Sequence, residues 1–379
     1  MLQSLSSNSK FHQRIIDAAL DRPSFQHLQA LIILAYTYLG TGSNRVWGIL
    51  AILTQQAKSM GLHIMDAPTK TNNTRSLQPL SLLPPANHFT SAEERRRAFW
   101  AIFLLNTHIS LSTGWQSPIS LEEIQLRLPC LETEFQMSKE CPSSHFIPFQ
   151  APGIRDQTAG EGDIYRTLCV EGCGMLNRVN TWLQIEWDQS NISAWKRREM
   201  EGLRMADEFE NWWRSLPRTV TSLELTMKNV NCAILLHGMY YRYVFSMQFF
   251  DHSALLMIFE SIAFAQLDER LCGSGDSTDP IQAQSPVSVV SEEALNRAHI
   301  AAVGLSNVAH FRNSSPDLTS HTSPFLPLFF FIGIRYLLAA KAFDSKIITD
   351  TTLDPLAAAL ESLAKQFPEA GILLLSQHT

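Results

Sequence analysis

The sequence predicts an all-α protein, a large array of about a dozen or more helices with short connections and two or three long polar loops. Three observations favour this class. Apolar residues recur every three or four positions along most of the 379 residues, as on the buried face of a helix. Serine or aspartate often precedes these stretches, and glycine or proline often follows them. Alternating runs joined by Asn-Gly or Asp-Gly turns are absent, so we expect few strands.

Three helices are expected near the start of the chain. After nine polar residues that should fray, residues 11–22 form a short amphipathic helix that we expect to act as a lid. Ser24 can cap a second helix that ends at the next glycine. A third helix covers residues 46–60 and is closed by Gly61 in the left-handed conformation, so the last two form an antiparallel hairpin.

The stretch that follows the first long loop predicts the central helix. Thr90 and Glu93 have the spacing of a capping box, so the helix should begin near Ser91. Residues 95–97 are three arginines, and residues 98–105 form an unbroken apolar run. A helix with no polar side in this run must be buried.

The end of the central helix is marked as clearly as its start. Gly114 can adopt the left-handed conformation that stops a helix, and Pro118 prevents its continuation. Ser120 and Glu123 repeat the capping spacing, which predicts a short second helix that ends near Pro129.

The remaining chain alternates loops with helices. Residues 66–89 and 130–160 lack periodicity, and the second of these loops is a candidate boundary between two halves of a single domain that covers residues 1–379. Residues 272–290 read as a flexible linker. In the last helix we expect Asp354 as cap and Pro355 at the first helical position. The helices are predicted over residues 164–183, 194–216, 225–250, 291–305, 325–343 and 354–368.

Composition limits the partners. The formal charge of −6 and the pI near 6.1 provide no basic field for phosphate backbones, so we expect no direct nucleic-acid contact. No apolar run reaches the roughly 18 residues of a membrane span, which predicts a soluble intracellular protein without membrane contact. The six cysteines are too widely spread for a zinc cluster and should be reduced thiols, so no cofactor is expected in this chain.

The central stretch resembles the signature of the fungal-specific transcription factor domain, the regulatory region that follows a binuclear zinc cluster in fungal transcription factors. Residues 60–63 (MGLH) and 211–217 (NWWRSLP) resemble further landmarks of that family. The sequence departs from the pattern at Asn106 and Thr107, where the family has Asp-Arg, and after the glycine, where the family has Arg-Pro. The matching residues are Glu94, Arg95, Arg96, Arg97, Trp100, Phe103, Ser110, Gly114, Leu128 and Pro129.

The resemblance implies a transcription regulator that acts in the nucleus, in some members on a biosynthetic gene cluster, and that is not an enzyme. It implies contacts with other transcription regulators or coactivators, a small-molecule effector in some members, and a candidate homodimer. Zinc would be needed only if a cluster precedes these residues, because the family reads DNA through that upstream module.

Two sets of residues are candidates for binding sites. His237, Tyr240 and Tyr241 could line an effector pocket, because aromatic walls with polar tips suit small molecules, although a histidine on an apolar helix face is more often part of the core. Arg95 to Arg97 could hold an acidic partner, but a basic run more often pairs with carboxylates such as Glu93 or Glu94.

Two alternatives to a regulator stay open at this point. Asp207, Glu208 and Glu210 resemble the acidic helix of magnesium-dependent terpene cyclases, although a second metal motif is missing and an ordinary charged face is favoured. Cys169 and Cys173 lie one helical turn apart, but no second pair completes a metal site. A helical small-molecule-binding module without DNA association is the other alternative.

Overall fold

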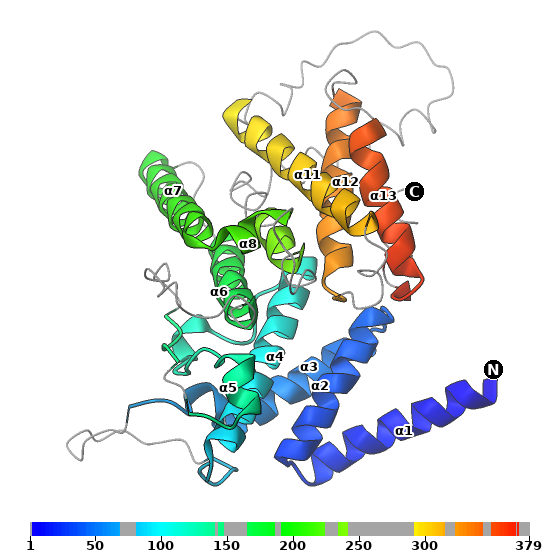
Figure 1. Ribbon diagram of the computed structural model, residues 1–379, viewed down its shortest axis with the longest axis vertical. Helices are drawn as coiled ribbons and strands as arrows, with labels where there is room; N and C mark the ends of the chain where they lie inside the picture. The colour runs from blue at the N-terminus through cyan, green and yellow to red at the C-terminus, as the bar shows by residue number, and fades with distance from the viewer. Residues whose placement is uncertain are drawn as a thin grey trace.

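The computed structural model describes residues 2–68, 81–140, 143–147, 165–185, 191–223, 234–241, 292–314, 323–343, 350–368 and 370. Across these residues the chain is helical, and the one β-type pairing is an isolated bridge between Arg127 and His145. The predicted all-α class is therefore confirmed. Figure 1 shows the helices within residues 2–113 in one half of the molecule, those within residues 165–221 beside the helix that ends at residue 113, and those within residues 292–364 grouped above the helix of residues 25–40.

The first three helices follow the prediction with one difference. They are α1 (Leu2–Asp21), α2 (Phe25–Gly40) and α3 (Arg45–Ser59). The fraying predicted for the first nine residues is wrong for residues 2–9, which are helical because they contain no proline or glycine that would stop α1. Ser24 accepts a hydrogen bond from the His27 amide (3.2 Å) and caps α2, as predicted.

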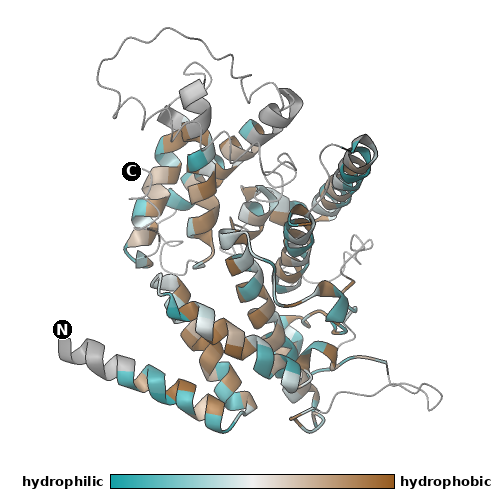
Figure 2. Ribbon diagram, turned by 180° about the vertical axis from the view of Figure 1, so that it is seen from behind, coloured by the Kyte–Doolittle hydropathy of each residue, from teal (hydrophilic) through white to brown (hydrophobic). Residues whose placement is uncertain are grey.

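The central helix α4 (Phe89–Thr113) is buried as predicted and packs against α2, α3 and α6 (Tyr165–Leu183). In Figure 2 the helices at the centre of the molecule contain many hydrophobic residues. Gly61 and Gly114 have φ of 68° and 72°, so both left-handed stops are confirmed.

Both predicted capping boxes are wrong. The N-cap of α4 is His88, the Thr90 hydroxyl contacts Ser138 Oγ (3.3 Å), and Glu93 turns inward to arginines that satisfy a carboxylate better than backbone amides do. After Ser120 the chain forms only the short η2 (Leu121–Glu123). The Ser120 side chain makes no capping hydrogen bond, and the Glu123 carboxylate pairs with Lys58 Nζ (2.6 Å).

An extended segment replaces the predicted second helix. The Leu128 amide donates to the Ser144 carbonyl (2.8 Å) and the Phe146 amide to the Leu126 carbonyl (3.0 Å), so backbone groups that a helix would use internally are paired across two segments. The one-turn α5 (Glu132–Gln136) follows.

Helices α6, α7 (Ile192–Ser215) and α8 (Arg218–Thr221) form the next layer, and residues 234–241 are also helical. A neighbouring segment approaches α6 closely at one of its glycines, since a Cβ at Gly174 would lie 2.7 Å from the ring of Phe146. The other parts of the predicted helix 225–250, together with the 272–290 linker and the Ser291 cap, lie outside the described residues.

The last three helices are α11 (Glu292–Asn313), α12 (Leu326–Phe343) and α13 (Asp350–Ala364). The start predicted for α13 is wrong, because the helix begins at Asp350 and contains Pro355 in its second turn. A proline near the start of a helix removes one donor only, so the first turn still forms. None of the helices in the described part of the chain has the length and apolarity to cross a bilayer.

Candidate functional site

The Glu93 carboxylate is the centre of the signature region. Its side chain is fully buried, near the start of α4. Arg96 Nη1 donates to Glu93 Oε2 (3.1 Å) and Arg97 Nε to Glu93 Oε1 (2.9 Å), at the i+3 and i+4 positions that adjoin on a helix. The Cys130 amide also donates to Glu93 Oε1 (3.0 Å). One buried acid therefore joins the entry of α4 to a loop 37 residues away.

Asp66 closes the second side of this network. Arg96 Nε and Nη2 donate to the two oxygens of Asp66, both at 2.7 Å, which is the bidentate geometry that fixes orientation as well as distance. The Arg127 amide donates to Asp66 Oδ2 (2.9 Å). The side chains of Arg96 and Asp66 are only 10% and 9% exposed, so water screens this pair weakly.

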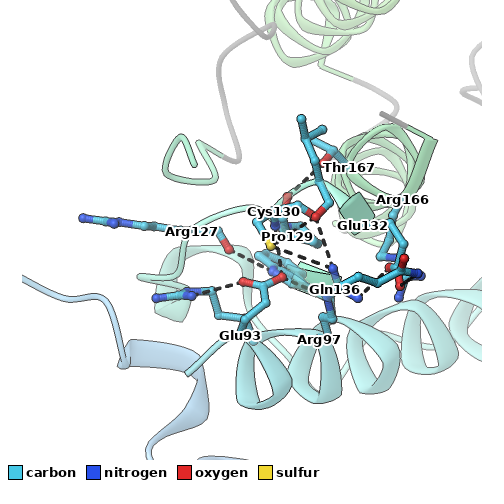
Figure 3. A network of polar contacts seen from close by, with 12 residues as sticks. Glu93, Arg97, Arg127, Pro129, Cys130, Glu132, Gln136, Arg166 and Thr167 are labelled. Atoms are coloured by element: carbon cyan, nitrogen blue, oxygen red, sulfur yellow. Dashed lines mark hydrogen bonds and ion pairs between the residues drawn. The ribbon is translucent and has the colours of Figure 1, made fainter. Parts of the chain in front are cut away.

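Glu132 closes the third side. Arg97 Nη1 donates to Glu132 Oε2 (2.7 Å), and Arg166 at the start of α6 donates to the same oxygen (3.1 Å). The guanidinium of Arg97 also lies over the ring of Phe135, 3.9 Å from its centroid. Figure 3 shows Arg97 between Glu93 and Glu132, with Arg166 reaching Glu132 from α6.

We call the six residues Asp66, Glu93, Arg96, Arg97, Glu132 and Arg166 the signature network. Three carboxylates face three guanidinium groups, so the formal charges cancel within the network. The exposed fraction of the side chains rises from 0% at Glu93 to 52% at Arg166, so the network runs from the core to the surface. Buried charges that are paired in this way hold position more than they add stability.

The Leu-Pro segment at the end of the signature lies inside this arrangement. The Thr167 hydroxyl of α6 donates to the Pro129 carbonyl (3.2 Å), as Figure 3 shows. Arg97 Nη2 donates to the Cys130 carbonyl (3.4 Å). Pro129 therefore holds the segment between α4 and α6.

A cluster of aromatic side chains packs next to the signature network. Trp100 Nε1 donates to the Arg127 carbonyl (2.9 Å), which fixes the same segment that the Arg127 amide fixes through Asp66. The ring of Trp100 packs edge to face on Phe103 (5.6 Å) and Phe146 (5.1 Å). The two signature aromatics therefore pack in the core and place the backbone of the 124–130 segment.

Side-chain amides hold the C-terminal end of α4. Asn180 Nδ2 of α6 donates to the Trp115 carbonyl (3.0 Å), and Nε2 of Gln184, the residue after α6, donates to the Gly114 carbonyl (2.5 Å). Trp115, which stands in place of the family's arginine, is 65% exposed and packs against Trp47.

Neutral side chains replace the ion pair that the family pattern has inside α4. Asn106 Nδ2 donates to Thr54 Oγ1 of α3 (3.0 Å), and Asn177 Nδ2 of α6 donates to Thr107 Oγ1 (3.2 Å). These four side chains are buried, and buried polar groups need hydrogen-bond partners, which the two contacts provide.

The electrostatics follow the geometry. Burial by itself would raise the pKa of Asp66, but hydrogen bonds from Arg96 and the Arg127 amide lower the pKa below its usual value. For Glu132 burial is likewise outweighed, because hydrogen bonding to Arg97 lowers the pKa. Burial and the negative charge of Glu93 raise the pKa of the Cys130 thiol to about 12, so this cysteine is a protonated thiol at neutral pH.

The structure brings most of the expected signature residues together. Arg96, Arg97, Trp100, Phe103 and Pro129 contribute to the site, and Gly114 ends the helix that carries it. Glu94 is exposed. Arg95 donates to the Pro84 carbonyl (2.7 Å).

Sequence reasoning missed the acids that complete the network. The spacing of Glu93 to Arg96 and Arg97 signals a pairing along one helix. No local signal identifies Asp66 or Glu132, because these residues lie 30 and 35 positions from their arginines.

The candidate effector residues form an aromatic cluster. Tyr240 stacks on Trp213 (ring centroids 4.4 Å) and on Phe209 (5.8 Å). His237 Nε2 lies 3.0 Å from the Val220 carbonyl, and its buried Nδ1 has no hydrogen-bond partner. Burial lowers the pKa of His237 to about 4, so the ring is neutral at neutral pH.

Tyr241 faces the C-terminal helices. A side chain at Gly304 of α11 would overlap with the Tyr241 ring, so the two helices approach closely there. Burial raises the pKa of Tyr241 to about 12.

Two of the three candidate acids of α7, Glu208 and Glu210, are partnered by arginines. Glu208 accepts from Arg178 and Arg204, both at 2.7 Å, and Glu210 from Arg214. Carboxylates used in this way do not form an open diphosphate–magnesium face, so the terpene-cyclase alternative has no support. Among the described residues no three His, Cys, Asp or Glu side chains lie close enough together to hold a metal ion.

The geometry offers a rigid and charge-neutral joint between helices. The six charged side chains pair with one another. The side-chain amides of α4 and α6 donate hydrogen bonds to backbone carbonyl or hydroxyl groups. This arrangement fixes the positions of α4, α6 and the segments near Asp66 and Pro129 relative to one another.

Comparison with known proteins agrees with the signature. The family model of the fungal specific transcription factor domain matches residues 3–213, which is more than half of the chain. The chain is 26% identical to the ascochitine biosynthesis cluster transcriptional regulator of Didymella fabae, over 40% of this chain and 25% of that protein. It is 30% identical to the asperfuranone cluster transcription factor of Emericella nidulans, over 38% of this chain and 21% of that protein.

A third relative is the citrinin biosynthesis transcriptional activator of Monascus purpureus, which is 32% identical over 29% of this chain and 18% of its own length. The matched parts thus span a quarter or less of the curated relatives. No solved structure matches the chain. The family match, the signature network and the all-α fold agree, and the chain belongs to the fungal-specific transcription factor domain family.

Proposed function

We propose that this chain is the regulatory region of a pathway-specific transcription regulator that controls a biosynthetic gene cluster in the nucleus. The observation that carries the proposal is the family match over residues 3–213, together with relatives whose names describe regulators of ascochitine, asperfuranone and citrinin clusters. The signature network supports a regulatory role, because it joins four segments into one unit.

The region acts through proteins. The net charge of −6 is unfavourable for binding to phosphates, and two of the three central arginines, Arg96 and Arg97, are paired with carboxylates. We therefore propose that residues 1–379 work as one regulatory domain that contacts coactivators, other regulators or a second copy of itself, and that DNA is read elsewhere.

A tethering experiment tests the regulatory role. We expect that fusing residues 1–379 to a foreign DNA-binding domain changes reporter transcription several-fold relative to that domain alone. Glu93→Gln should remove the change, because it breaks the network at its buried centre, whereas the exposed control Glu94→Gln should keep it. A stable nuclear fusion that leaves transcription unchanged under every growth condition would refute the proposal.

Partner and DNA contacts are tested separately. Light scattering on the purified chain distinguishes a monomer from the proposed homodimer. In a gel-shift assay at low salt we expect no retarded duplex, and retardation that disappears with added salt would show that the chain binds the phosphate backbone after all.

We also propose a small-molecule effector at His237, Tyr240 and Tyr241. The unpartnered Nδ1 of His237, buried beside Trp213, is the observation that favours it, since a ligand hydroxyl could donate to this nitrogen. Phenol is a suitable minimal probe. It should raise the melting temperature of the wild type and not of His237→Phe, and equal stabilisation of both proteins would refute the site.

A further inference from the structure

The helices α11, α12 and α13, which we call the C-terminal bundle, pack closely on one another and share the hydrophobic core of the rest of the chain. A Cβ at Gly333 of α12 would lie 3.2 Å from Leu305 of α11 and 3.5 Å from Leu356 of α13, so the three helices meet at this position. Asn313 Nδ2 of α11 donates to the Pro355 carbonyl of α13 (3.0 Å). The fully or nearly buried residues of this core include Ala301, Ala302, Leu305, Val308, Ala309, Phe330, Ile334, Leu337, Leu356, Ala359, Leu360 and Leu363.

The seam between the bundle and the body of the molecule is built differently. Phe325, just before α12, lies between Tyr36 of α2 (ring centroids 5.8 Å) and His108 of α4 (4.5 Å). The Phe329 ring lies 6.2 Å from His108, and Phe367, beyond α13, approaches Gly40 at the end of α2. The helix of residues 234–241 forms the other part of the seam, where Tyr241 packs on Gly304 of α11 and Phe329 of α12 packs on Gly238. Rings and glycines therefore form this seam.

The seam also lacks charge. Among the residues whose side chains the structure describes, no hydrogen bond or ion pair joins the bundle to α1–α8. His108 is the one titratable nitrogen base in the ring contacts just described, and burial lowers its pKa to about 3, so it stays neutral. Apolar contacts without directional bonds can separate and reform without leaving a buried charge unpaired.

The body is held together in the opposite way. The signature network fixes the entry of α4 to the segments near Asp66 and Glu132 by charged hydrogen bonds. The family match ends at residue 213, so the bundle lies wholly beyond it. Two regions that differ in bonding and in family coverage therefore meet at aromatic side chains that pack on one another and on glycines.

We propose that the C-terminal bundle is a separately folding unit whose docking through Phe325 is reversible, so that the domain has a docked and a released state. Release uncovers Tyr36 on α2 and His108 on α4 and leaves the signature network intact. A ligand or partner that binds one state better shifts the balance between them. The regulatory meaning of this device rests on the proposed function, but the existence of the two states does not.

Hydrogen exchange on the full chain, read by mass spectrometry, tests the proposal with two variants. Phe325→Ala removes the ring at the seam, and Leu305→Ala removes a side chain that is also buried, inside the bundle. We expect Phe325→Ala to increase exchange about tenfold in α2 near Tyr36 while the amides of α11 and α13 stay protected. Leu305→Ala should increase exchange about tenfold within the bundle and leave α2–α4 unchanged.

Small-angle scattering supplies the second readout, because a released bundle enlarges the radius of gyration of Phe325→Ala and not of the wild type. Tyr36→Ala approaches the seam from the other side and should reproduce the pattern of Phe325→Ala. Loss of protection throughout both regions in either variant, including outright unfolding, would show one cooperative unit and overturn the proposal. Unchanged exchange and scattering in both seam variants would overturn it too. No transcription readout is involved, so this result is independent of the tethering assay.

Discussion

The sharpest test of the signature network is the substitution Glu93→Gln. The change keeps the shape of the side chain and removes its charge. Glu93 Oε1 accepts from Arg97 Nε and the Cys130 amide, while Oε2 accepts from Arg96 Nη1. A glutamine can place its oxygen at the first position only, so its NH₂ group must face the Arg96 donor.

The expected loss of stability in Glu93→Gln follows from the burial of this side chain. Breaking a buried ion pair by removing one partner costs about 3–5 kcal/mol. Arg96 keeps its bidentate pair with Asp66, and Arg97 keeps Glu132, so neither guanidinium is left without a carboxylate. We therefore expect a loss near the lower end, about 3 kcal/mol, of the free energy of unfolding.

Urea denaturation followed by helical circular dichroism measures this loss. The neighbouring acid Glu94 is exposed, and Glu94→Gln should change the stability by less than about 0.5 kcal/mol. Both variants remove one negative charge from the same helix turn, so net charge is controlled. If Glu93→Gln is as stable as Glu94→Gln, the network does not hold the core and our reasoning about it is wrong.

Two further predictions concern acid sensitivity and the helix stop. The folded-state pKa of Asp66 is lowered, so its stabilisation is present above the unfolded pKa near 3.8 and is lost as the pH falls through the folded value. Asp66→Asn should therefore reduce stability at neutral pH and flatten its decline in acid denaturation, and a curve parallel to the wild type would contradict this. Gly114→Ala should cost about 1 kcal/mol because φ is 72°, whereas Gly48→Ala inside α3, with open space around it, should gain about 0.5–1 kcal/mol in thermal unfolding. A gain at both positions would refute the backbone argument.

Local signals in the sequence predicted what local physics decides. Gly61 and Gly114 end helices at the predicted residues because a left-handed φ is a property of the glycine itself. Ser24 caps α2 for the same kind of reason, since its hydroxyl reaches an amide three residues on.

Tertiary contacts decided the rest. Thr90 and Glu93 have the spacing of a capping box, yet the acid binds two arginines and the amide of Cys130, because the core offers it charged donors. The participation of Asp66 and Glu132 depends on loops that bring distant segments together, and no pattern in a single sequence encodes such a meeting.

The network raises the question of why a core should contain charges at all. Well-packed apolar residues are often as stable as a buried ion cluster or more stable, so stability alone does not explain it. Directional bonds fix where segments lie, and the bidentate contact of Arg96 with Asp66 sets the 66 and 127 segments against α4 within one geometry. The triple change Asp66→Leu, Glu93→Leu, Arg96→Met separates the two roles.

We expect the triple variant to unfold within about 2 kcal/mol of the wild type, because no unpaired charge remains at the replaced positions. The Arg127 amide, which now donates to Asp66, should lose its acceptor and exchange its hydrogen faster, and the tethered reporter should lose its response. A variant that is stable and keeps full reporter activity would show that the ion pairs are dispensable for regulation, whereas one that is stable but silent would establish that they act by placing the segments that α4 joins.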